Sequence, residues 1–545
     1  MNGLAAQFGP ALLIATLVAP LIVLAVFFVP ALRTLARAIT PIAAAPALAA
    51  GALAIGGGPF GAELPVLRVS LWLDQPGGLL LAAAALVWLL VSLFALKEGQ
   101  GSPNADRFAV SWLLTMAGSL GVFIAADLLT FYLVYALVSV PAYYLVAHDE
   151  EPSSRRAGAI YMAFALLGEA VLLIAFVMLT AAEPSGSVQI RDVVTASVAS
   201  PWRDAALALV ILGFGMKIAL VPLHGWMPLT YTAAPIPAAA VLSGAGVKAG
   251  VIGLIRFLPL GAAFPGWGEA LVWVGFISAF YGVAIGVTQR DPKTMLAYSS
   301  VSQMGVIAAA FGMALANTKQ GVATEVAFYA ANHVLVKAAL FLSVGALAAL
   351  DGRARTLALI VAALLGLSLA GLPLTGGALA KLALKDLFGD GAAGVASQLS
   401  AAATTALMLV FVMRLARLPG EAGVPSFRRL WSWVALAAAA LLVPWLMAPA
   451  VGGAADALAL NKLTDAIWPL LVGAALAAGL WAMENQLPRI PAGDIVVAEE
   501  AAFRASLPLG AAFERADRGL REWPAAGLAL LMVALALAAA GYASR

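Results

Sequence analysis

Long uninterrupted apolar stretches recur along almost the whole chain, and they limit the folds that it can adopt. A helix that crosses the hydrocarbon core of a bilayer needs about 20 consecutive apolar residues. The chain has 545 residues, of which 63% are hydrophobic and 11% charged, so it is more apolar than a water-soluble fold can bury. We predict an all-α polytopic membrane protein with about 14–16 transmembrane helices. The sixteen candidate stretches are 11–32, 36–56, 78–96, 107–125, 127–147, 157–181, 203–221, 232–258, 267–288, 293–316, 323–350, 356–385, 396–416, 430–449, 464–483 and 524–543.

The basic residues between these stretches predict an orientation. Short cytoplasmic loops of membrane proteins collect Lys and Arg. Connections after odd-numbered stretches hold 19 of the 31 basic residues, whereas connections after even-numbered stretches and the C-terminal tail hold seven. We therefore expect both termini to lie outside the cytoplasm. Because the basic residues are dispersed, the net charge of +3 gives no reason to expect nucleic acid as a partner.

The remaining five basic residues are lysines inside otherwise apolar stretches. A charge at the centre of a membrane helix costs roughly 2.5–3.5 kcal/mol, so it normally faces a polar interior and marks an ion pathway or a proton relay. Lys385 also has a structural explanation, because it precedes Asp386 at the end of a stretch and can extend to the headgroups. The five are Lys217, Lys248, Lys337, Lys381 and Lys385.

Two histidines and one glutamate accompany these lysines. His224 follows Lys217 by seven residues, and His333 precedes Lys337 by four, which places the latter pair on one helix face. Glu169 is the only carboxylate near the middle of a stretch. A buried His or Glu can also serve only to hydrogen-bond a neighbouring helix, so a structural role stays open for each. No His and carboxylate cluster has metal-ligand spacing, and we expect neither a metal site nor a catalytic residue.

Prolines predict helix breaks beside two of the lysines. Pro222 has no N–H and clashes with the carbonyl four residues earlier, that of Ile218, next to Lys217. The segment LVPLHG at 220–225 is similar to GLPLTG at 371–376, which contains Pro373 and precedes Lys381. Broken helices at corresponding places in two halves of a chain are typical of transporters built from inverted repeats. A hydrated ion site is therefore expected at each break.

Five blocks of sequence follow one another between about residues 107 and 390. In this order they resemble the antiporter-like proton-pumping subunits of respiratory complex I, a family that includes Mrp-type sodium/proton antiporters and the membrane arms of energy-converting hydrogenases. The resemblance implies a fourteen-helix core with two inverted five-helix repeats and discontinuous helices in spans 7 and 12. The blocks are PLHGWMP at 222–228 with the preceding Lys217, AAPIPAAAVLSGAGVKAG at 233–250, DPKTMLAYSSVSQMG at 291–305, NHVLVKAALFLSVG at 332–345 and GLPLTGGALAK at 371–381.

The resemblance also implies a division of the chain. We expect N-terminal transmembrane helices over 1–106, a first half-channel over 107–260 and a second half-channel over 261–416. Further transmembrane helices are expected over 417–483. An amphipathic interfacial helix and a last transmembrane helix are expected over 484–545.

Carried over position by position, the resemblance assigns roles to the buried polar residues. Lys217 matches the central lysine of the first half-channel, and Lys248 the connecting residue of the eighth span. His333 and Lys337 match the link to the second half, Lys381 the lysine of the twelfth span, and His224 the His of the family's PxHxWxP block.

The chain departs from the family at one important position. The glutamate that pairs with the central lysine in the fifth span is replaced by Ala136. Without that carboxylate Lys217 loses a stabilising anion. Glu169, in the neighbouring span, is our candidate for a compensating group.

These features together predict a proton-translocating subunit of a multisubunit complex in the bacterial cytoplasmic (inner) membrane. Its partners would be other integral membrane subunits, the lipid bilayer and protons, with Na⁺ as an alternative ion. The chain has no cysteine and therefore no thiolate ligand for an iron–sulfur cluster, and we expect no cofactor in it. A quinone, if used, would be bound by partner subunits. Two alternatives stay open, a Mrp-type monovalent cation/proton antiporter subunit and a structural membrane subunit whose channel has decayed.

Overall fold

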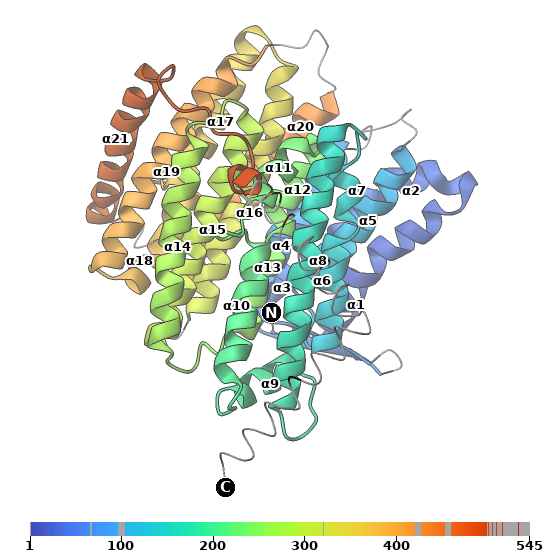
Figure 1. The fold of residues 1–545 in the computed structure, drawn as a ribbon. Coiled ribbons are helices and arrows are strands. Elements are labelled where there is room, and N and C mark those ends of the chain that lie inside the picture. Colours follow the sequence, from blue (N-terminus) through green and yellow to red (C-terminus); the bar gives the residue numbers. More distant parts are fainter. Residues whose placement is uncertain are drawn as a thin grey trace. The chain divides into compact units, whose positions relative to one another are not determined.

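The computed structural model describes residues 2–65, 68–95, 104–319, 321–419, 427–452 and 459–498, and five single positions beyond them. Almost all of these residues form helices that run side by side (Figure 1). Residues 1–492 form one compact unit, which contains every site described below. The α-helices are α1 Asn2–Phe27, α2 Arg33–Ile39, α3 Ala45–Gly57, α4 Gln75–Ala95, α5 Ala105–Gly121, α6 Leu128–Ser139, α7 Ala142–Val146, α8 Pro152–Ala181, α9 Ile190–Ser197, α10 Arg203–Lys217, α11 Trp226–Ala233, α12 Ile236–Val241, α13 Lys248–Phe257, α14 Pro265–Gly286, α15 Pro292–Asn317, α16 Val322–Ala348, α17 Gly352–Ala370, α18 Gly376–Phe388, α19 Ala392–Ala416, α20 Phe427–Met447 and α21 Leu460–Ala482.

Four short helices of other types complete the helical part. Three are 3₁₀ helices, and one, η3, is a π-helix that joins α12 to α13. They are η1 Pro30–Leu32, η2 Thr40–Ala44, η3 Leu242–Gly246 and η4 Ala448–Val451.

Thirteen helices of the described part are long and apolar enough to cross a membrane. They correspond to thirteen of the sixteen predicted stretches. Of the other three, 107–125 forms α5, which has only 17 residues, and 203–221 forms α10, which has 15. The last, 524–543, falls outside the continuously described residues, as does most of the interfacial helix expected after residue 484. The first helix begins at Asn2, earlier than the predicted residue 11, because the apolar pattern tolerates the polar Asn2 and Gln7 near its end.

A β-hairpin interrupts the all-helical pattern. Strands β1 Phe60–Leu64 and β2 Val69–Leu73 pair antiparallel, with Phe60 opposite Leu73. The outer edge of β2 bonds to the segment after α5, since Trp72 N–H donates to the Ile124 carbonyl at 2.8 Å. The hairpin was not predicted, because two five-residue apolar strands cannot be told by composition from the ends of the adjoining helices.

Two helices are broken beside a lysine, in the predicted spans 7 and 12. Residues 218–225 separate α10 from α11, and residues 371–375 separate α17 from α18. The first helix already ends at Lys217, so Pro222 stands within the non-helical segment and does not strip the Ile218 carbonyl of a helical partner, as we had expected. Gly371 adopts a φ of 102°, a conformation that favours glycine and turns the chain out of α17. The inverted-repeat relation and the division into half-channels stay predictions.

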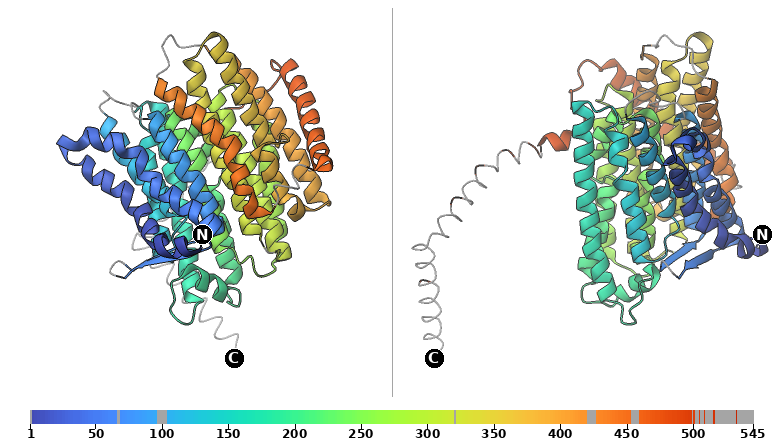
Figure 2. Two further views of the ribbon diagram at one scale, coloured as in Figure 1. Left: turned by 180° about the vertical axis from the view of Figure 1, so that it is seen from behind. Right: turned by 90° about the vertical axis from the view of Figure 1, so that its right-hand side faces the viewer.

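Helix α16 occupies the middle of the bundle. It packs against α4, α12, η3 and α13, which lie in the first predicted half or before it, and against α15, α17 and α18 of the second. Helix α20 covers a further side of it, on the face seen in the left view of Figure 2. Because α16 contacts both halves, polar side chains on it can connect them.

Candidate functional site

Lys217 is the last residue of α10 and lies buried beside the helix break. Its ammonium donates a hydrogen bond of 2.7 Å to the hydroxyl of Ser139, at the end of α6. It also lies 5.2 Å from the ring centroid of Tyr135 and 5.8 Å from that of Tyr161, within the range of cation–π attraction. A hydroxyl and two aromatic faces thus surround the charge, and no ion pair with a carboxylate within 4.0 Å is found among the described residues.

Glu169 is the carboxylate that acts on this lysine. It lies in α8, is 5% exposed, and is close enough to interact with the Lys217 charge and with the Ser139 hydroxyl. Its Oε1 atom has no hydrogen-bond partner among the described residues. Ala136, where the resemblance predicts the family glutamate, stands one turn before Ser139 on α6. The sequence did not predict that Ser139, Tyr135 and Tyr161 surround Lys217. The one clue in the sequence was that Ser139 lies one helical turn from Ala136.

Helix α13 begins beside α16, in the middle of the bundle, and passes this first site. Gly250 lets it pass close to α10, since a Cβ atom there would lie 3.1 Å from Cβ of Lys217. Lys248, the first residue of α13, is fully buried, and its Nζ lies 2.8 Å from Nδ1 of His333 on α16. When the ammonium donates this bond, the imidazole is neutral and its proton resides on Nε2. That Nε2 atom is buried and has no partner among the described residues.

Lys337 lies one turn beyond His333 on α16. It is fully buried, and its ammonium donates a hydrogen bond of 2.6 Å to the carbonyl of Leu296 on α15. It is close enough to Lys248 for the two charges to repel each other. Lys248, His333 and Lys337 therefore form one contiguous group of basic side chains at the boundary between the two predicted halves.

Lys381 and His224 lie apart from this central group. Lys381, on α18, packs its side chain against Gly371 in the second helix break and lines a cavity together with Lys385. His224 lies in the first break and is fully buried, with its ring centroid 5.0 Å from that of Tyr281 on α14. Its closest ring contacts are with α14 and α15. No group of three or more His, Asp or Glu side chains that could hold a metal occurs in the part of the chain that the structure describes.

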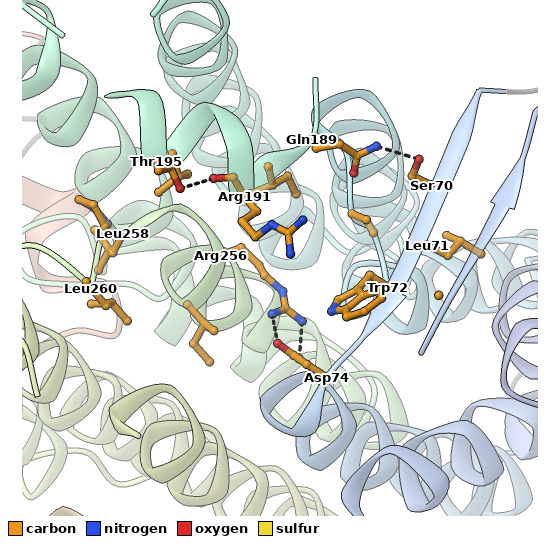
Figure 3. Close-up of a pocket in the computed structure, with 18 of the residues that line it drawn as sticks. Ser70, Leu71, Trp72, Asp74, Gln189, Arg191, Thr195, Arg256, Leu258 and Leu260 are labelled. Carbon is orange, nitrogen blue, oxygen red and sulfur yellow. Dashed lines mark hydrogen bonds and ion pairs between the residues drawn. The ribbon is translucent and has the colours of Figure 1, made fainter. Parts of the chain in front are cut away.

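A larger cavity of about 990 Å³ opens beside the hairpin (Figure 3). It is lined by β2, α9 and the end of α13. At its wall Arg256 forms a two-pronged ion pair with Asp74, with N···O distances of 2.5 and 2.7 Å, which ties α13 to the start of α4. Burial alone would raise the pKa of Asp74, but the charge and hydrogen bonds of Arg256 and the Gly77 N–H outweigh it and hold that pKa below its usual value. This pair anchors the helices, and Arg256 lies on the same helix as Lys248, towards the other end of α13.

The fold and the sequence are similar to those of known membrane proteins. Hydrogenase-4 component B of Escherichia coli K12 is 29% identical over 246 residues, 44% of this chain and 36% of that protein. NADH-quinone oxidoreductase subunit M of the same strain is 29% identical over 253 residues, 44% of this chain and 49% of that protein. The match thus spans less than half the length of either relative.

A solved structure shows the same fold over nearly the whole chain. The Mrp complex from Dietzia sp. DQ12-45-1b superposes with a TM-score of 0.77 at 22% identity, over 98% of this chain and 63% of the matching one. Residues 125–408, more than half of the chain, match the family described as NADH:quinone oxidoreductase/Mrp antiporter, TM. The chain is therefore a multi-pass membrane protein that belongs to the NADH:quinone oxidoreductase/Mrp antiporter family.

Proposed function

We propose that this chain translocates protons as a subunit of a multisubunit complex in the bacterial cytoplasmic membrane. The observation that carries the proposal is the contact between Lys248 and His333, at 2.8 Å, with Lys337 one turn further along α16. Three neighbouring basic side chains, all fully buried, are costly in a membrane protein unless they serve transport. A structural scaffold gains nothing from them.

The proposed path uses the buried groups in order. A proton taken up at Lys217 passes by way of Lys248, His333 and Lys337 to Lys381, with bound water filling the gaps. Each transfer changes the charge of one site and so alters the proton affinity of the next, because unit charges a few ångströms apart interact strongly at low effective dielectric. The energy is supplied by partner subunits. Both chain termini are proposed to lie on the extracytoplasmic side, which the distribution of basic residues favours.

The carried ion separates this proposal from the cation/proton antiporter alternative. In membrane vesicles that contain the intact complex, we expect proton movement of the same rate in Na⁺-free buffer and in buffer with Na⁺, because the proposed path from Lys217 to Lys381 consists of nitrogen bases, with Glu169 as the buried carboxylate beside Lys217 in the described part of the chain. Hard cations such as Na⁺ need several oxygen ligands. The measurement follows vesicle acidification with a pH-sensitive dye, and a requirement for Na⁺ would favour antiport.

Glu169 is proposed to stand in for the glutamate that is missing at Ala136. We expect Glu169→Ala to lower the rate of proton movement by about tenfold, because Lys217 then has no nearby anion to stabilise its protonated form. The double variant Ala136→Glu with Glu169→Ala should recover much of the loss, since the carboxylate returns from a neighbouring helix. Unchanged pumping in Glu169→Ala, or no recovery in the double variant, would show that Glu169 does not serve this role.

A further inference from the structure

A cavity at the end of α18 connects Lys381 with the surface of the protein. Its volume is about 120 Å³, enough for a few water molecules at about 30 Å³ each. Lys381 and Lys385 are four residues apart and line it from the same face of α18. Ser397 and Gln398 of α19 add polar groups to the wall. Helix α21, which runs beside α19 (Figure 1), supplies further lining residues. The cavity therefore offers a hydrated route outwards from Lys381.

The outer end of this route carries a carboxylate from α21. Asp465 also lines the cavity, and its Oδ2 lies 2.9 Å from Nζ of Lys385. The Asp465 side chain is 56% exposed and that of Lys385 32%, so the pair is reached both from the cavity and from solvent. Asp465 lies beyond residues 125–408, the part that matches the family.

The pair stands on the side to which the proposed path leads. The end of α18 and the start of α21 adjoin connections that follow even-numbered stretches, which the charge distribution places outside the cytoplasm. Lys381 itself forms no hydrogen bond or ion pair with any described residue. A proton on Lys381 thus has water as its next acceptor, and Asp465 is the carboxylate on the cavity wall.

Given the proposed function, we propose that Asp465 is the outermost proton-transfer residue of the exit route and that its ion pair with Lys385 closes the route between transfers. An N–H bond of the Lys381 ammonium breaks, the cavity water relays the proton, and an O–H bond forms on the Asp465 carboxylate. Neutral Asp465 no longer holds Lys385, and the pair opens. The carboxylic acid then loses its proton to bulk water, and the charged pair re-forms.

The test compares variants of Asp465 and Lys385 in vesicles that contain the intact complex. Asp465→Asn keeps the size and the hydrogen-bonding capacity of the side chain but cannot accept a proton, and we expect it to slow proton release by about tenfold. Asp465→Glu should release protons at close to the unaltered rate. Added formate, a small carboxylate that can enter the cavity, should restore release in Asp465→Asn and leave the unaltered complex unchanged.

Two further variants distinguish proton transfer by Asp465 from a purely structural role of its ion pair. Lys385→Gln breaks the same ion pair but keeps the proton-accepting carboxylate, so it should slow proton release less than Asp465→Asn does, and added formate should not change its rate. Equal losses in Lys385→Gln and Asp465→Asn, with no effect of formate, would mean that the pair only holds α21 in place and would overturn the inference. Lys217→Ala is measured in parallel. If it is inactive while Asp465→Asn is unimpaired, the inference fails alone; if Lys217→Ala pumps normally, the proposed function fails.

Discussion

Replacing Lys337 with alanine is expected to lower proton translocation by at least about tenfold. Lys337 is fully buried and is held by the Leu296 carbonyl at 2.6 Å, one turn from His333. Its removal takes away the proton-accepting group that follows the Lys248 and His333 pair. Beyond Lys337, the rest of α16 has no ionisable residue that could take over this role.

The effect is measured as vesicle acidification per turnover of the complex. Lys319→Ala is a matched control, because it removes the same charge from a partly exposed side chain outside the proposed path. The Lys319 side chain is 35% exposed, and its Nζ lies 4.0 Å from Oε1 of Glu325. Assembly is checked on native gels. Equal rates in Lys337→Ala and Lys319→Ala would remove Lys337 from the path.

Replacing Lys217 with alanine is expected to lower proton translocation equally strongly, because Lys217 stands at the start of the proposed path. The Lys217 ammonium is the only cation near the Ser139 hydroxyl and the Tyr135 and Tyr161 rings in the part that the structure describes. Its loss leaves the first break without a proton carrier, and Glu169 without its positive partner. Lys217→Arg is not expected to restore translocation, because a guanidinium stays protonated and cannot pass a proton on.

The measurement is the same acidification assay with Lys217→Ala and Lys217→Arg, and assembly is again followed on native gels. Translocation by Lys217→Arg at the unaltered rate would mean that the residue supplies only a fixed charge. Translocation by Lys217→Ala at that rate would mean that it has no role in transport.

Much of the fold could be predicted because membrane helices are recognisable from composition alone. Thirteen of the sixteen stretches form helices long enough to span, and the breaks at 218–225 and 371–375 lie where the proline motifs indicate. The strands β1 and β2 could not be predicted, since two five-residue apolar strands cannot be told by composition from the ends of the adjoining helices. The break after Lys217 precedes its proline, because the chain turns at Ala219, whose φ is 59°.

The sequence alone predicted the buried Lys and His residues of the site, but it did not predict which side chains they contact. Residues such as Lys248 and His333 are conspicuous in apolar sequence, but only the packing of α13 against α16 brings them within 2.8 Å. Ser139 is an ordinary polar residue in the sequence, and its contact with Lys217 depends on how α6 and α10 meet. Lys385 was open to a structural explanation, and its ion pair with Asp465 comes from a helix eighty residues away.

The most direct test of a single path through both halves is the residual proton translocation in Lys217→Ala and in Lys337→Ala, measured in one preparation against the unaltered complex. The two lysines belong to different predicted halves, and the contact between Lys248 and His333 lies between them in the proposed path. We predict that each variant falls to less than about a tenth of the unaltered rate, because a break anywhere in a serial path stops all flow. Retention of about half the rate in each would show two separate channels, and undiminished translocation in both would contradict a proton path through these lysines.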